Sequence, residues 1–336
     1  MKTIEEFQAF YKNNLQSELD SIDTLRKSTI KQIIKRIFIF ILIIAVVLLI
    51  GALINSAIYG SIFLENNDDI AIPMIIAVIV SFILILTLPA QCRSIKKKFT
   101  IEFKKRIIEP IIHFIHEGLK YEPTNYIPQN VFIKSKIFTQ YPDKYYGDDY
   151  VSGIIDKTEI MFSEIHAKYK YSSSDDDKDE YAPLFDGLFC VADFHKNFNG
   201  KYFVLPDFAE RKFGKIGQMF QKIGSSHGKL IQLENPEFEK IFAVYGSDQV
   251  EARYILSSSM MQRLVDFQKK CNKTPSLSFV DSSVFVAIPY KKALFETKLI
   301  SSVANQEKIT SYFEDLQLVI GIVEDLNLNT RIWSKT

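Results

Sequence analysis

The stretch IFIFILIIAVVLLIGALINSAIY, residues 37–59, decides the fold, because it is uncharged and long enough to cross the hydrocarbon core of a membrane. A second uncharged run, IAIPMIIAVIVSFILILTLP at 70–89, follows after a short loop. A signal peptide is the alternative for the first run, but the run starts far from Met1, is too long for such a segment and is followed by a second span. The two runs therefore predict a transmembrane helical hairpin joined by residues 60–69.

Basic residues flank the predicted hairpin, whereas the connecting loop GSIFLENNDD has neither lysine nor arginine. The flanking residues are Arg26, Lys27, Lys31, Lys35 and Arg36 before the first span, and Arg93, Lys96, Lys97, Lys98, Lys104, Lys105 and Arg106 after the second. Loops rich in these residues stay on the cytoplasmic side. We therefore expect two spans, both termini in the cytoplasm, and the acidic loop outside.

Helical periodicity continues on both cytoplasmic sides of the hairpin. The apolar stripes consist of Tyr11, Leu15, Leu19, Ile22, Ile30 and Ile33 on one side, and Phe99, Phe103, Ile107, Ile111, Phe114 and Ile115 on the other. Antiparallel spans place these extensions side by side, which predicts a paired helical stalk with a kink at Pro110. The alternative is two separate amphipathic helices lying on the anionic leaflet.

Composition excludes several classes of protein. A net charge of +1 provides no general attraction for nucleic acid. Cys92, Cys190 and Cys271 are odd in number and far apart, so they indicate neither a disulfide framework nor a zinc knuckle. We therefore expect the soluble part of the chain to face a reducing compartment.

From about residue 120 the sequence becomes β-rich and predicts an α+β fold, an antiparallel-sheet domain covered by helices. Residues 151–171 and 184–198 predict a long hairpin around the hydrophilic connector SSSDDDKDE at 172–180. YFVLP at 202–206 predicts a further strand, and LSFVDSSVFVAIP at 277–289 predicts a hairpin turning at Asp281. The segment 309–328 predicts a helix that covers the sheet.

The predicted organisation is therefore a cytoplasmic amphipathic helix at 1–36, the transmembrane hairpin at 37–89, a stalk helix at 90–119 and the α+β domain at 120–336.

The stretch VYGSDQVEARYIL, residues 244–256, and the serines that follow it combine residue types found in catalytic sites. Asp248 and Glu251 have the spacing of a capping box, with Val250, Tyr254 and Ile255 as the apolar side of a short helix. Ser257 or Ser258 can cap a second helix with a core stripe of Met260, Leu264 and Phe267. The serines of this stretch lie in no GxSxG or SxxK motif, so we interpret these polar residues as helix caps.

Two groups of histidines are candidates for metal binding. Glu164 and His166 lie on one strand face, as do Asp193 and His195 on the next strand. Folding of the hairpin about a tip near Asp177 would offset the two pairs by about six residues, or about 20 Å, which disfavours a shared ion.

Glu109, His113 and His116 form the second candidate, at helical spacing, but ordinary interfacial histidines are the favoured interpretation. The chain also has no Walker A, GxGxxG, HExxH or kinase motif, so we predict no catalytic residue and no cofactor.

The segment RKFGKIGQMFQKIG, residues 211–224, is a basic amphipathic stretch. Its cations, Arg211, Lys212, Lys215 and Lys222, are candidates for contact with the membrane surface, although packing on the sheet is the simpler interpretation.

Several segments agree, in order and spacing, with those of a known family. They are EFKKRIIEPIIHFIHEGLKYEP at 102–123, SEIHA at 163–167, GLFCVADFHKNFNGKYFVLPD at 187–207, NPEFEKIFAVYGSDQVEARYILSSSMMQRL at 235–264, LSFVDSSVFVAIP at 277–289 and DLNLNTRIW at 325–333. With these segments the chain resembles an uncharacterised bacterial membrane family, domain of unknown function 3137. The resemblance implies a two-span protein of the bacterial cytoplasmic membrane. It also suggests a LemA-like membrane protein as partner, and it supplies no catalytic residue.

The leading hypothesis is a non-enzymatic membrane scaffold or adaptor whose cytoplasmic domain binds a protein partner, such as a LemA-like protein, or its own copies. The alternatives are a metal-dependent or enzymatic module centred on His166 and His195, and a lipid sensor acting through residues 211–224.

Overall fold

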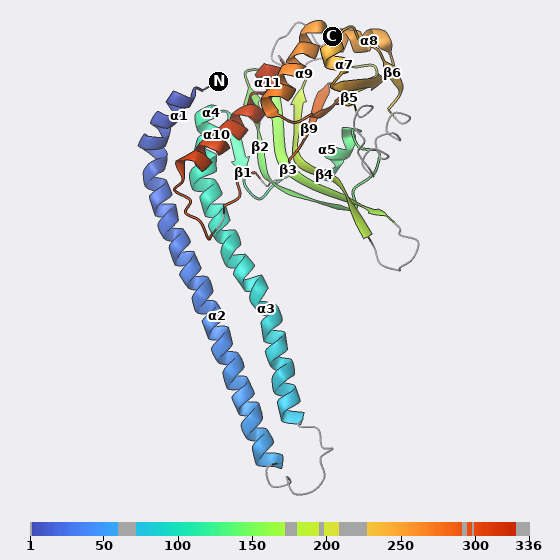
Figure 1. Ribbon diagram of the computed structural model, residues 1–336. Coiled ribbons are helices and arrows are strands. Elements are labelled where there is room, and N and C mark those ends of the chain that lie inside the picture. The colour runs from blue at the N-terminus through green and yellow to red at the C-terminus, as the bar shows by residue number, and fades with distance from the viewer. Residues whose placement is uncertain are drawn as a thin grey trace. The chain divides into compact units, whose positions relative to one another are not determined.

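The structure is a computed structural model with an α+β fold (Figure 1). It describes residues 2–59, 72–171, 180–194, 198–207, 227–290, 294–297 and 299–326. Contacts divide the chain into two compact units. The sheet unit comprises Met1–Phe10, Ile108–Glu296 and Gln306–Thr336, and the helical unit comprises Tyr11–Ile107 and Thr297–Asn305.

The helices, with the two π-helical turns marked η, are α1 (Ile4–Phe10), η1 (Tyr11–Leu15), α2 (Gln16–Tyr59), α3 (Ile72–Phe103), η2 (Lys104–Ile108), α4 (Glu109–Ile115), α5 (Gln129–Lys134), α7 (Pro236–Glu239), α8 (Gln249–Ile255), α9 (Ser258–Cys271), α10 (Gln306–Ile320) and α11 (Ile322–Asp325). The strands are β1 (Leu119–Glu122), β2 (Lys144–Ile155), β3 (Thr158–Tyr171), β4 (Glu180–Asp193), β5 (Lys201–Pro206), β6 (Lys229–Ile231), β7 (Phe242–Gly246), β8 (Ser276–Val280) and β9 (Ser283–Pro289).

Among the described residues, two helices are long and apolar enough to cross a membrane, one within Ile4–Ala57 and one within Ile72–Ile115. In the most apolar window of each, only 11% of the residues are buried. A core helix of a soluble protein would bury most of such a surface. Exposure of the apolar side chains agrees with contact to lipid, as the sequence predicts.

The helical unit is a pair of antiparallel helices, α2 and α3. Gly51 lets them approach closely, because a Cβ atom at that position would lie 2.6 Å from the Cβ of Ala77. Nearer the other end, the Arg106 guanidinium lies 2.6 Å from a carboxylate oxygen of Glu18. The pairing supports the predicted stalk rather than two separate helices on a leaflet.

The interruption predicted at Pro110 falls in one continuous helix, Ile72–Ile115. Within this helix the α-helical pattern changes to the π-helical turn η2 at Lys104–Ile108, and Pro110 follows directly, in α4. Proline has no backbone N–H to donate to the preceding turn, which is a known cause of an altered hydrogen-bond ladder. The kink itself stays a prediction.

In the part of the chain that the structure describes, the sheet has nine antiparallel strands in the order β1-β2-β3-β4-β9-β8-β5-β7-β6. The long hairpin is confirmed as β3 and β4, and the hairpin turning at Asp281 is confirmed as β8 and β9. Residues 151–171, expected to form one strand, are instead split between β2 and β3. Asp156 has a φ of 54° and with Lys157 makes the tight turn between them.

Both faces of the central strands are buried, so the sheet is covered on both sides. On β9, Phe285 and Ala287 pack in a core with Phe132 of α5, while Val284 and Val286 are buried on the opposite face. In Figure 1, α5 lies on one side of the bent sheet and α9, α10 and α11 lie on the other. The helix predicted at 309–328 is confirmed as helical but is divided at Gly321 into α10 and α11. The Tyr290 hydroxyl, just after β9, donates to Asp315 of α10 at 3.2 Å.

Asp248 and Ser257 cap α8 and α9, as predicted. An Asp248 carboxylate oxygen accepts from the Glu251 amide at 2.7 Å, and the Ser257 hydroxyl accepts from the Met260 amide at 3.4 Å. The predicted apolar side of α8 is only partly right. Ile255 is buried, but Val250 is 78% exposed.

Candidate functional site

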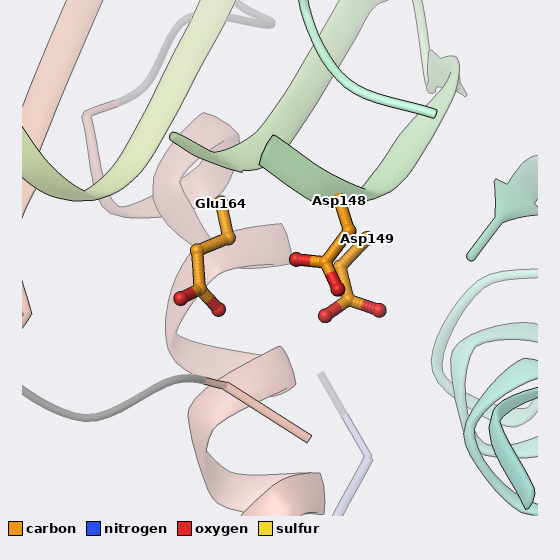
Figure 2. A group of neighbouring side chains, drawn as sticks. All are labelled: Asp148, Asp149 and Glu164. Carbon is orange, nitrogen blue, oxygen red and sulfur yellow. The ribbon is translucent and has the colours of Figure 1, made fainter. Parts of the chain in front are cut away.

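Three acidic side chains converge where β2 and β3 pair (Figure 2). Asp148 on β2 lies opposite Glu164 on β3, and the register between these strands shifts immediately after Asp148. Asp149 occupies the bulge with a φ of 58°, a left-handed conformation that aspartate tolerates better than most residues. The bulge therefore adds a third carboxylate to a pair of facing acids.

One carboxylate oxygen from each of Asp148, Asp149 and Glu164 lies within 4.8 Å of the others. Asp149 is 1% exposed and Glu164 is 4% exposed. Like charges opposite each other on a sheet destabilise it, and buried charges need partners. The surroundings of the cluster therefore decide what it can do.

Glu164 is satisfied by neighbours within the sheet unit. One of its oxygens accepts from the Leu294 amide at 2.7 Å, and the other lies 3.1 Å from Nε2 of His166. The other ring nitrogen of His166, Nδ1, lies 2.9 Å from the Asp186 carboxylate.

Both ring nitrogens of His166 thus face carboxylates, and the hydrogen bond to Glu164 is the main reason that the pKa of His166 rises to about 9. The imidazole is therefore cationic at neutral pH. A cationic imidazole offers no lone pair to a metal ion.

Asp149 also accepts a hydrogen bond within the domain, from the Tyr121 hydroxyl of β1. Burial is the main cause that holds the pKa of the Tyr121 hydroxyl above its usual range. Asp148 and Asp149 have further interaction partners as well. Carboxylate oxygens are the ligands of hard cations such as Ca²⁺, Mg²⁺ and Mn²⁺, so the cluster has suitable chemistry for one, but several of its oxygens already accept hydrogen bonds.

The metal site considered for Glu164, His166, Asp193 and His195 is tested only in part, because His195 lies outside the described residues. Glu164 pairs with Leu188 on β4, and Asp193 lies five residues further along that strand. The offset predicted between the two pairs is therefore confirmed for Asp193.

The candidate group Glu109, His113 and His116 does not keep its helical spacing. α4 ends at Ile115, and His116 is extended, with a φ of −153°. Its Nδ1 accepts a hydrogen bond from the Gly118 amide at 3.2 Å. The ring is therefore turned to its own backbone rather than to the other two residues.

The basic segment with Arg211, Lys212, Lys215 and Lys222 lies outside the described residues, so its membrane contact stays a prediction.

A second feature of the sheet unit is a cleft of about 640 Å³, which the sequence patterns did not reveal. Its lining includes the aromatic residues Phe132, Phe138, Tyr141, Phe198 and Phe203. Tyr141 is exposed and Phe138 is partly buried, whereas the other three are buried and form the floor of the cleft. Phe132 stacks on Phe138 with ring centroids 4.9 Å apart. These residues come from α5 and from loops and strands far apart in the chain, so only the fold assembles them.

Polar groups at the edge of the cleft are held by the protein itself. The Nε2 atom of His227 donates to the Lys136 carbonyl at 2.6 Å, and Asp281 is paired with Lys134 at 3.0 Å. The exposed side chains of Lys136 and Lys201 give the lining positive charge. An aromatic surface with cations at its edge is suited to binding an apolar or aromatic group that has acidic neighbours.

These observations define a class of protein, an antiparallel-sheet α+β domain in one chain with two helices of membrane-spanning length and composition. Residues 183–328 match the model of a family described as Protein of unknown function (DUF3137). The resemblance recognised in the sequence is confirmed over this part of the chain.

Among solved structures, the crystal structure of the mycobacterial trehalose monomycolate transport factor A, TtfA, is similar with 12% sequence identity and a TM-score of 0.32. The similarity covers 64% of this chain and 96% of that chain. A similarity at this level carries no argument about function. No curated protein matches the chain.

Proposed function

We propose that this chain is a non-enzymatic adaptor of the bacterial cytoplasmic membrane whose sheet domain binds a protein partner. The aromatic cleft of about 640 Å³ carries the proposal. Aromatic side chains grouped in a pocket are typical anchors of protein interfaces, since they offer large contact area at low entropic cost. The two apolar helices supply the anchor, and the basic flanks favour both termini in the cytoplasm.

The chemistry of the cleft indicates the kind of partner. An apolar or aromatic side chain of the partner fills the space between the phenylalanines, and acidic residues beside it face Lys136 and Lys201. A LemA-like membrane protein and a second copy of this chain are both partners to examine.

Site-specific photocrosslinking in native membranes tests the proposal. A photoreactive amino acid at Tyr141, which is 66% exposed at the cleft, should give a discrete adduct with a protein identified by mass spectrometry. The same probe at Tyr171, an exposed aromatic residue outside the cleft, should not give that adduct.

Charge reversal separates specific binding from chance proximity. The variant Lys136→Glu/Lys201→Glu should weaken the Tyr141 adduct by at least about tenfold. The matched control Lys120→Glu/Lys240→Glu reverses two exposed lysines outside the cleft and should leave it unchanged. Equal adducts from Tyr141 and Tyr171, or equal effects of both double variants, would refute binding in the cleft.

The topology has its own test. In a background without reactive native cysteines, Asn66→Cys should react with an impermeant reagent from outside intact cells, and Ser173→Cys should react only after lysis. The reverse pattern would place the domain on the other side of the membrane.

A metal-dependent module is the second candidate function, favoured by the carboxylate oxygens of Asp148, Asp149 and Glu164 lying within 4.8 Å of one another. Elemental analysis and thermal unfolding of the full chain with Mg²⁺, Ca²⁺ or Mn²⁺ test it. One ion per chain, lost in the variant Glu164→Gln, would favour this module over the adaptor.

A further inference from the structure

A groove of about 820 Å³ lies between α2 and α3 in the helical unit. Its lining changes character along the helices. Lys35, Arg36 and Lys98 contribute cations, whereas Ile39, Phe40 and Ile43 contribute apolar surface. Glu102 is the one acidic residue among those that line it, so cations outnumber carboxylates three to one.

The groove extends along α2 from Leu25 to Ile43, and the end that contains Lys35 to Ile43 lies at the level where a membrane would begin. The first uncharged run starts at Ile37, immediately after Lys35 and Arg36, and the second ends at Pro89, two residues before Gln91. Residues 35–43 of α2 span roughly 12 Å along the helix axis, at ~1.5 Å per residue. The cationic part therefore coincides with the headgroup region of the leaflet, and the apolar part with the first segment of the acyl chains.

The helix pair is in close contact further along the spans, so the groove is a local opening. A Cβ atom at Gly51 would lie 2.6 Å from the Cβ of Ala77, which shows how near the two backbones approach there. At the level of the groove, Arg36 bridges the space instead, by donating from Nη1 to Oε1 of Gln91 at 2.7 Å. One such bond leaves most guanidinium donors available for other acceptors.

We propose that this groove binds one anionic glycerophospholipid of the surrounding leaflet. The phosphate lies among Lys35, Arg36 and Lys98, because basic pockets between helices at the cytoplasmic membrane surface suit such headgroups. One acyl chain follows Ile39, Phe40 and Ile43, where hydrocarbon covers side chains that water would otherwise meet. The proposal rests on the membrane anchoring in the proposed function.

Native mass spectrometry of the full chain in detergent tests the site with phosphatidylglycerol and phosphatidylcholine that carry identical acyl chains. The wild-type protein should retain phosphatidylglycerol at least about tenfold more than phosphatidylcholine. Glycerol phosphate without acyl chains should not displace it, because the apolar part of the site contributes to binding.

Two variants and a matched control define the position of the lipid. Lys35→Gln/Arg36→Gln/Lys98→Gln should lose the preference, whereas Arg93→Gln/Lys96→Gln/Lys97→Gln removes the same charge from exposed positions outside the groove and should keep it. Ile95→Trp keeps every cation and fills the groove, so it should lower retention of phosphatidylglycerol at least about tenfold.

Each other outcome overturns the proposal. No preference in the wild type excludes an anionic-lipid site, and equal loss in the control triple variant shows general attraction to a basic surface only. Thermal unfolding in the same detergent checks the fold, and Ile95→Trp decides alone if the triple groove variant does not fold.

Two measurements distinguish a failure of the lipid-site proposal from a failure of the adaptor proposal. The Tyr141 crosslink reports the partner without involving the groove, and resistance of the chain to alkaline carbonate extraction reports the anchor alone.

Discussion

The acidic cluster on β2 and β3 and the basic groove between α2 and α3 use charge in opposite ways. In the cluster, Glu164 is nearly buried and bound on both oxygens, by the Leu294 amide and by His166. In the groove, the side chains of Lys35 and Lys98 are exposed at the edge of an apolar surface. Buried charges that are matched inside a domain hold its structure, whereas exposed cations beside an apolar surface can bind a ligand.

The largest loss of stability should come from removing the nearly buried carboxylate of Glu164. Glu164→Ala leaves the Leu294 amide without its acceptor and leaves His166 with Asp186 alone, so it should reduce the free energy of unfolding by about 2–3 kcal/mol. Chemical unfolding of the full chain in detergent measures the change.

The control for this substitution is an exposed pair. Glu237 lies 2.6 Å from Lys269, and both side chains are at least half exposed. Glu237→Gln should therefore cost less than about 1 kcal/mol. A cost for Glu164→Ala no larger than this would show that the cluster does not hold the sheet together.

A pH series sharpens the same comparison with a smaller effect. The pKa of His166 is raised to about 9 in the folded protein, from an ordinary value of 6.5. Its ion pairs therefore stabilise the fold fully below about pH 6.5, and this contribution is lost as pH rises through 9. We expect the stability of the wild type to decline by roughly 2 kcal/mol over that window.

The variant His166→Gln cannot titrate at this position and should show a flatter profile between pH 6.5 and 9. Parallel profiles for the two proteins would mean that His166 is not held cationic by Glu164 and Asp186.

The smallest change in stability should come from substituting Asp248, whose carboxylate contacts a backbone amide three residues away. Asp248 caps α8 through the Glu251 amide, so Asp248→Ala should cost about 1 kcal/mol. Asp248→Asn keeps a capping oxygen and should cost much less. Thermal unfolding of both variants distinguishes a helix cap from a catalytic carboxylate. If Asp248 were catalytic, the Ala and Asn variants would lose function equally and would not differ in stability in this way.

The sequence alone predicted the elements that depend on local pattern. Two uncharged runs, the alternation of β3 and β4, and the caps at Asp248 and Ser257 each follow from residues close together in the chain. The sequence did not predict the contacts that the Glu251 side chain makes with distant residues. Its carboxylate accepts from the Asn199 and Gly200 amides at 3.0 Å and from the Tyr202 hydroxyl at 2.6 Å.

Tertiary structure decided where chemistry could occur, because each candidate site joins residues that are distant in sequence or depends on one shift of register. The bulge at Asp149 adds a carboxylate to the pair Asp148 and Glu164. The aromatic cleft joins Phe132 to Phe203, and the groove joins Arg36 to Gln91. Sequence patterns determine whether a segment is apolar, extended or helical. The position of a side chain relative to one dozens of residues away depends on packing and strand register, which local pattern does not encode.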